Sequence, residues 1–465
     1  MRIAWCTPFS EKSAIGEFSA LVVPALRNLG LDVDIWYPRG AGGRTAPDRG
    51  RELSHACGPT LREYDSVVYQ IGDNVRNHGQ LLTAADEVPG VVIMHDVSLV
   101  HLFFPMLIGM TRDELTELLL RLSPERPNAP SEFAQDPSSW AWSPETAVNF
   151  PFSELAMHNA LSVVTHSQFA AGLFRDKYLG DISVLPLPVL HRPQGDSTAK
   201  LPPIDPDRAL VLQAGTLNAN KRIDDVIAGF ERSQARSVAQ LVICGHGSQE
   251  EIDRLRDRAQ HLIADGDALV LGAVSDEVLD ALRQRALVSM VLRHPSSEAS
   301  SAVLVDSMAY GNAVVAVSGG HYGEMPNDTV RLVSVPPDPD EIAAAIDSLV
   351  LDETATRALG SRAAAHVLAE HSPDAYARAI VPILRRAGGV VPRNWLVDEI
   401  AQAMVRTGFG ADDLLGSVVT RTAIELFGGT PRRPEALRST PRAKPERVAR
   451  AARTVADRPR QAPCP

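Results

Sequence analysis

Residues 292–326 read LRHPSSEASSAVLVDSMAYGNAVVAVSGGHYGEMP, and this stretch contains the pattern that decides the fold. Apolar runs at 288–292 and 313–317 predict two buried strands, and the residues between them have the spacing of a helix over 300–310. A strand, a helix and a second strand at this spacing form a βαβ unit, which implies a parallel sheet. Small polar residues stand at the expected helix start, where free backbone N–H groups favour an anion such as phosphate.

The same alternation of short apolar runs and helical periods extends over most of the chain. It begins near the N-terminus and restarts after a Pro-rich stretch at 185–206. We therefore predict an α/β protein with two Rossmann-like, doubly wound parallel-sheet domains, residues 1–190 and 207–385, joined by a linker at 191–206. Because ligands of open α/β sheets bind beyond the carboxyl ends of the strands, we expect the domains to face each other across a cleft.

Three segments depart from this rhythm. Residues from about 110 to 152 include a less regular, Pro-containing stretch, which predicts an insertion in the first domain. Residues 386–427 are predicted to form a C-terminal helical extension. Residues 428–465 contain seven Pro and ten basic residues but almost no apolar periodicity, so we predict a disordered basic tail.

Composition narrows the class of protein. The chain of 465 residues carries a net charge of −11 in spite of its basic tail, so the body is strongly acidic and nucleic acid is not an expected partner. Four scattered cysteines suit a reducing compartment. There is no signal-peptide pattern at the start and no apolar run of membrane-spanning length, so we expect a cytoplasmic protein without integral membrane contact. Arg far outnumbers Lys, which suggests a GC-rich bacterial source.

Two carboxylates flank the expected anion site. Glu298 directly precedes the helix start at Ser300 and Ser301, where it can meet the hydroxyls of a sugar beyond the phosphates. Asp306 follows eight residues later and can accept hydrogen bonds from a ribose diol. Local chemistry alone leaves a second interpretation open, in which this is an N-capped surface helix with solvated acids.

The segment resembles the signature of family-four retaining glycosyltransferases of the GT-B fold, the "glycosyl transferases group 1" type. These proteins have two Glu separated by seven residues, and here the pair is Glu298 and Asp306, with a shorter second acid. The resemblance continues through residues 311–315 and from Gly320 to Glu324. It implies a nucleotide-sugar donor in the C-terminal domain, with Glu298 beside the donor sugar and Asp306 on the ribose.

The loop 215–222 is also similar to the family, and this similarity implies that Lys221 neutralises the donor diphosphate. The family often has an Arg where this chain has Thr216, which leaves Arg222 as a candidate substitute. Gly245 and Gly247 resemble the family's glycine turn after the next strand.

Further along the chain, Val274 lies in a segment that resembles the family's contact with the base. In the first domain the similarity is looser. Gly16 lies in the first loop, where we expect the backbone to approach the donor phosphate or the acceptor closely. A glycine that serves only the turn is an equally good interpretation. His95 resembles a family residue at the acceptor side, where it would hydrogen-bond a hydroxyl or accept its proton, although a structural role is the alternative.

These features predict a retaining glycosyltransferase that moves a sugar from a nucleoside-diphosphate sugar to a small soluble acceptor, with natural-product biosynthesis as a suitable setting. Glu298, Lys221 and His95 are the predicted catalytic residues. Because a cation and a helix N-terminus already face the phosphates, we expect no metal dependence and no cofactor besides the donor. A sugar-nucleotide epimerase of the same fold and a non-catalytic, donor-binding partner protein are the alternatives.

Overall fold

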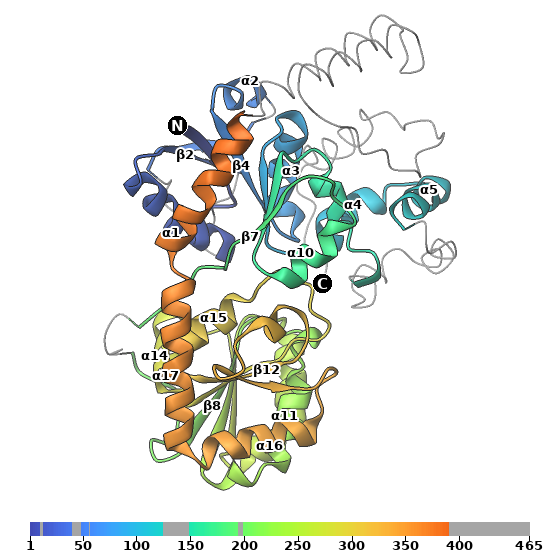
Figure 1. The fold of residues 1–465 in the computed structure, drawn as a ribbon. Helices are drawn as coiled ribbons and strands as arrows, with labels where there is room; N and C mark the ends of the chain where they lie inside the picture. Colours follow the sequence, from blue (N-terminus) through green and yellow to red (C-terminus); the bar gives the residue numbers. More distant parts are fainter. Residues whose placement is uncertain (10–12, 40–47, 55, 124–147, 194–198, 390–465) are drawn as a thin grey trace, which may run out of the picture.

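The computed structural model of the chain describes residues 1–389, apart from 10–12, 40–47, 55, 124–147 and 194–198. Two domains, each built on its own parallel sheet, are stacked end to end (Figure 1). This arrangement confirms the predicted α/β class and the division into two Rossmann-like domains.

The sheet of the N-terminal domain has seven strands in the order β3-β2-β1-β4-β5-β6-β7, and all its pairs are parallel. Side chains alternate between its two faces, so Val67 and Tyr69 belong to one core and Val68 to the other. The strands are β1 (Arg2–Cys6), β2 (Asp32–Tyr37), β3 (Gly50–Glu52), β4 (Ser66–Ile71), β5 (Val91–Met94), β6 (Ser162–Thr165) and β7 (Ile182–Val184).

Helices cover both faces of this sheet. One face packs against α3, α4 and α10, and the other packs against α1. The helices of the domain are α1 (Ala14–Asn28), α2 (Gly58–Leu61), α3 (Val75–Glu87), α4 (Val100–Leu107), α5 (Arg112–Leu122), α9 (Ser153–Met157) and α10 (Gln168–Arg175).

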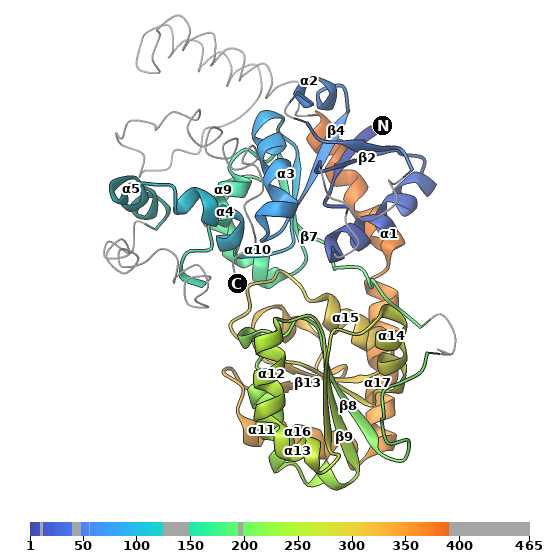
Figure 2. The same ribbon diagram turned by 180° about the vertical axis from the view of Figure 1, so that it is seen from behind.

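The sheet of the C-terminal domain has six parallel strands in the order β10-β9-β8-β11-β12-β13. Figure 2 shows α11 and α12 on one side of it and α14 on the other. The strands are β8 (Ala209–Ala214), β9 (Ala239–Cys244), β10 (Ala268–Gly272), β11 (Val288–Val291), β12 (Ala313–Val317) and β13 (Val330–Val333). The helices are α11 (Ile223–Arg232), α12 (Gln249–Arg258), α13 (Gln260–Ala264), α14 (Asp276–Arg285), α15 (Ala302–Ala309), α16 (Pro339–Val350) and α17 (Glu353–Glu370), and 3-10 turns lie at η1 (Ala219–Lys221), η2 (Gln234–Ser237) and η3 (Gly320–Glu324).

A last helix over residues 373–389 returns to the first domain (Figure 1, orange). Its buried residues Tyr376, Ile380 and Leu384 pack into the same core as β1 and α1. We predicted that residues up to 385 belong to the C-terminal domain, and this helix therefore departs from that boundary. The reason is that its apolar face finds its partner surface on α1 and β1, a contact that no local pattern in the sequence announces.

Several local predictions need correction. The helix expected over 300–310 begins only at Ala302, because Ser301 is its N-cap and accepts a hydrogen bond from the Leu304 N–H at 3.4 Å. The predicted insertion starts with a regular helix, α5, which a capping box between Thr111 and Glu114 initiates. Residues 124–147 of the insertion and the predicted extension and tail from 390 onward lie outside the described residues. Within the described ranges, no helix combines the length and the apolarity needed to cross a membrane.

Candidate functional site

The carboxyl ends of the two sheets meet at two loops, one after β5 and one after β11. Across this contact, the Ala299 N–H donates to the His95 carbonyl at 2.9 Å, and the Val97 N–H donates to the Ser297 carbonyl at 2.9 Å. Asp96 and Glu298 face each other there as an isolated antiparallel bridge. The structure thus brings Glu298 and His95, which we predicted from separate domains, to one interface.

Glu298 lies in a buried cluster of charged and polar side chains. Arg293 donates to its Oε2, and the Tyr322 hydroxyl donates to its Oε1 at 2.5 Å. Burial would raise the pKa of Glu298, but the positive charges of Arg293 and Lys221 outweigh it and lower the pKa to about 2. Glu298 is therefore an anion at every physiological pH, so it can orient and stabilise charge but does not act as a proton donor.

Lys221 lies at the end of the loop that follows β8, and it is buried, with only 6% of its surface exposed. Burial lowers its pKa from 10.5 to about 8, against the attraction of Glu298. Within the described part of the chain, Lys221 forms no ion pair. A buried ammonium without a directly paired carboxylate is suited to an anionic ligand.

The other predicted cation, Arg222, has a different place. It adopts the left-handed conformation (φ 54°) at the start of α11, and its Nε donates to Asp225 Oδ2 at 2.6 Å. The structure thus engages its guanidinium with its own helix. Arg293, which we did not predict, is the second cation near Lys221.

The predicted glycines allow the loops at this edge to touch. Gly245 has φ 149°, and a Cβ on it would lie 1.6 Å from the Gly215 carbonyl oxygen, so only glycine permits this approach. A Cβ on Gly247 would meet Leu217 at 3.0 Å. Val274 is half-buried after β10 and packs beside the core under α14.

Around the start of α15, the backbone is only partly free. We expected the N–H groups of residues 299–301 to be available to an anion, but the Ala299 N–H is engaged by His95 across the domain interface. Ser300 is half-buried, and the Ser301 side chain caps the helix. The anion site predicted here therefore has fewer free donors than the sequence suggested, because the other domain occupies one of them.

Asp306 is buried within α15. Its Oδ1 accepts from the Leu190 N–H at 2.9 Å and the His191 N–H at 3.0 Å, and its Oδ2 lies 2.7 Å from His191 Nδ1. The hydrogen bond to Asp306 raises the pKa of His191. In this structure the carboxylate holds the chain between the domains, and its predicted contact with ribose stays a prediction.

Both ring nitrogens of His95 have partners inside the protein. Nδ1 lies 3.2 Å from His166 Nε2, and Nε2 lies 2.6 Å from the terminal amide of Gln70. The His166 Nδ1 lies 3.0 Å from the Leu185 carbonyl and must donate to it, so the other ring nitrogen of a neutral His166, Nε2, accepts. His95 Nδ1 is then the donor to His166, and His95 Nε2 must accept a hydrogen bond. The side-chain amide nitrogen of Gln70 is the group that can donate to His95 Nε2, so we assign this nitrogen, and not the amide oxygen, to the position that faces His95.

This network keeps His95 neutral, because burial and the neighbouring His166 hold the pKa of His95 well below its usual value. The role of His95 as an acceptor of a substrate proton stays a prediction, and it requires the bond to Gln70 to open. Gly16 lies in the first turn of α1, where a Cβ would lie 2.6 Å from the Pro8 carbonyl oxygen. Its glycine is thus required by close packing of the first loop, whether or not a ligand also approaches.

Sequence reasoning assigned no role to three residues of the site, Arg293, His321 and Tyr322, and it noted Asp96 only as the neighbour of His95 at the acceptor side. Burial and the neighbouring Asp73 raise the pKa of Asp96 to about 7, and the positive charge of Arg293 acts against them. The available signal was position, since Arg293 lies in the loop after β11 and His321 in the turn η3 that follows β12. In the described part of the chain, no three His, Cys, Asp or Glu side chains gather as a metal site requires, and metal independence stays a prediction.

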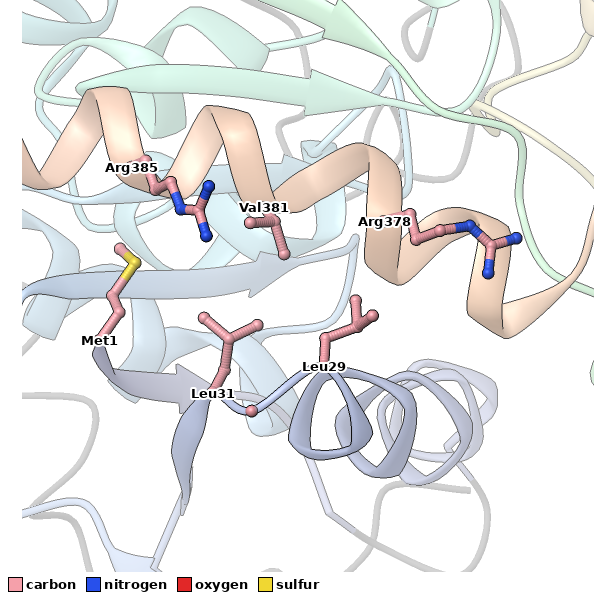
Figure 3. Close-up of a pocket in the computed structure, with 7 residues that line it drawn as sticks. Met1, Leu29, Leu31, Arg378, Val381 and Arg385 are labelled. Carbon is pink, nitrogen blue, oxygen red and sulfur yellow. The ribbon is translucent and has the colours of Figure 1, made fainter.

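One pocket of about 290 Å³ lies far from this chemistry, at the other end of the N-terminal domain (Figure 3). Met1, Leu29, Leu31 and Val381 line it, with Arg378 and Arg385 at its rim. Met1 precedes β1, so the pocket is at the amino edge of the sheet, whereas open α/β sheets bind ligands at the carboxyl edge. We therefore place the candidate site at the domain interface.

Comparison with known proteins finds similarity to glycosyltransferases. Residues 197–366 match the family described as glycosyl transferases group 1. An uncharacterized glycosyltransferase of Methanocaldococcus jannaschii is 28% identical over 186 residues, which are 40% of this chain and 46% of that protein. The match thus spans about half the length of this curated relative.

Solved structures share the two-domain fold over nearly their whole length. The sucrose-phosphate synthase of Thermosynechococcus elongatus aligns with a TM-score of 0.56 at 16% identity, covering 83% of this chain and 98% of that chain. Anabaena HepE in complex with UDP and glucose aligns with a TM-score of 0.54 at 15% identity, covering 83% and 99%. At these identities the likeness establishes the fold. The chain thus has the GT-B fold of these structures, and its residues 197–366 match the group 1 glycosyltransferase family.

Proposed function

We propose that the protein transfers a glycosyl group from a nucleoside-diphosphate sugar to a hydroxyl of a small acceptor, with retention at the anomeric carbon. The observation that carries this proposal is Lys221, a buried cation with no ion-pair partner in the described ranges, beside the anion Glu298 at the meeting edge of two Rossmann-like sheets. A cation and an anion side by side suit a ligand with a negative diphosphate at one end and a sugar that becomes positive during transfer at the other.

The proposed division of labour follows from these charges. Lys221 neutralises the diphosphate as it leaves, which requires no bound metal. Glu298 stays ionised and stabilises positive charge on the sugar. The N-terminal domain brings the acceptor in from the side of Asp96 and His95, on the face of the sugar that the diphosphate leaves.

Lys221→Ala tests this proposal directly. We expect kcat/KM for the donor to fall roughly 30- to 1000-fold, which corresponds to loss of one preorganised electrostatic partner of about 2–4 kcal/mol. Because the charge also serves the ground state, the affinity for the nucleoside diphosphate should fall as well. The matched control is Lys200→Ala, which removes an exposed lysine of the linker and should leave both quantities unchanged.

The assay measures release of nucleoside diphosphate with and without acceptors. UDP is the first nucleotide to test, because UDP and UDP-glucose are bound in the structures of Anabaena HepE. Release that depends on acceptor supports transfer, an epimerised donor indicates an epimerase, and binding without turnover indicates a partner protein. Activity of Lys221→Ala within twofold of wild type would exclude the loop after β8 from the diphosphate site.

A further inference from the structure

Several buried polar side-chain atoms that have no hydrogen-bond partner among the described residues lie on three loops at the carboxyl edge of the C-terminal sheet. Natural proteins leave few such atoms unpaired, so a group of them in one region calls for a physical reason. They follow β8, β11 and β12 and are Asn218 Oδ1, Asn220 Oδ1, Ser296 Oγ and both ring nitrogens of His321.

These three loops touch one another. The His294 N–H donates to the Asn220 carbonyl at 2.9 Å, which joins the first loop to the second. A Cβ on Gly320 would lie 3.1 Å from the Ser296 Cβ, which places the third loop against the second. The unpartnered atoms therefore belong to one region, beside Lys221 and Glu298.

His321 has two ring nitrogens without hydrogen-bond partners among the described residues, more than any other residue of this group. It is 1% exposed, its ring lies against Tyr322 with centroids 3.8 Å apart, and Tyr322 itself donates to Glu298. Burial lowers the pKa of His321 to about 4, with Arg293 and Lys221 contributing in the same direction against Glu298. The ring is therefore neutral at pH 7, with one N–H and one lone pair to satisfy.

The chemistry of a neutral imidazole restricts the groups that can satisfy it. A hydroxyl both donates and accepts, so sugar hydroxyls complement the N–H and the lone pair together. A carboxylate only accepts, and it would leave the lone pair of the ring unpaired. A protonated ring would have no lone pair and could donate two hydrogen bonds to a carboxylate. The positive charges of Arg293 and Lys221 oppose this protonation, so the ring keeps its preference for hydroxyls.

We propose that His321 is a specificity-determining residue that hydrogen-bonds hydroxyls of the transferred sugar and so favours an uncharged, hydroxylated sugar over a uronic acid. This inference rests on the proposed function and deepens it by naming the class of sugar. A buried site that is built for a hydroxyl rejects an analogue without it, because its own polar groups then stay unpaired.

The test compares His321→Phe with wild type, since Phe keeps a ring against Tyr322 but removes both nitrogens. The donor is UDP-glucose, or the best substrate in a screen of UDP-, GDP- and dTDP-sugars, together with its monodeoxy analogues and the matching uronic acid donor. His321→Gln retains a donor and an acceptor and should recover part of the lost rate. His261→Phe, at an exposed histidine in α13, is the matched control.

We expect His321→Phe to lower kcat/KM for the parent donor roughly 5- to 150-fold, the range for leaving one buried polar group unpaired. Affinity for the free nucleoside diphosphate should be unchanged, because that ligand lacks the sugar. Wild type should discriminate by a similar factor against at least one monodeoxy donor, and His321→Phe should lose that discrimination. A general loss of structure would not produce this pattern.

The inference is overturned if wild type and a folded His321→Phe discriminate equally among the monodeoxy donors, or if the uronic acid donor is preferred. Where His321→Phe does not fold, the same comparison with His321→Gln decides, since a changed preference supports the inference and an unchanged one refutes it. A wild-type protein that binds and turns over no nucleotide-sugar refutes the proposed function itself, which is a distinct result.

Discussion

Replacement of Glu298 by Gln removes the only anion that contacts Arg293 in the described part of the candidate site. The two side chains are 13% and 15% exposed, so the pair is largely withdrawn from water. Breaking a buried ion pair by removing one partner costs about 3–5 kcal/mol, because the remaining charge stays buried without compensation. Lys221 loses the attraction of the same carboxylate, which acts in the same direction.

For a domain of this size, that loss corresponds to a melting temperature lower by about 6–20 °C. Binding of a nucleoside diphosphate should respond in the opposite sense. With Glu298 gone, Arg293 and Lys221 face the ligand without a competing anion, so UDP should bind at least as tightly as to wild type and should restore much of the lost stability. Turnover should nevertheless fall steeply, since the carboxylate that stabilises the sugar is missing.

Differential scanning calorimetry with and without UDP measures the first two effects, and release of nucleoside diphosphate measures the third. The control is the double variant Arg293→Met with Glu298→Gln, which removes both charges and should be more stable than Glu298→Gln alone. A melting temperature of Glu298→Gln within about 2 °C of wild type would refute the buried pair. Abolished UDP binding with normal stability would show that Glu298 serves the diphosphate and not the sugar.

Two further predictions concern Lys221 and Asp306. Because the pKa of Lys221 is about 8, this residue loses its charge above pH 8, whereas a terminal phosphate has already lost its second proton near pH 6. The affinity for UDP, measured by calorimetric titration, should therefore fall about tenfold from pH 7 to pH 9. Lys221→Arg should make the affinity nearly independent of pH over this range. An equal slope in both proteins would contradict this assignment. Asp306→Ala should weaken UDP binding by about 1–3 kcal/mol and also lower the melting temperature, because the carboxylate accepts the N–H groups of Leu190 and His191. Lower stability with unchanged UDP affinity would leave Asp306 a purely structural role.

The sequence by itself determined the architecture of each domain. Strands β8, β11 and β12 and the helices between them were predictable because buried parallel strands form apolar runs and amphipathic helices repeat every 3.6 residues. The position of Lys221 after β8 and of Glu298 after β11 followed from the same pattern, since loops at the carboxyl ends of parallel strands share one edge.

Only the tertiary structure decided what these residues contact. Asp306 meets His191 across 115 residues of sequence, and His95 meets His166 across 71, so neither partner lies within the range of a local pattern. The return of helix 373–389 to the first domain and the convergence of His321 on Glu298 likewise depend on how two sheets pack together. Periodicity in a sequence records which face of an element is buried, whereas the partner on that face is selected by the fold as a whole.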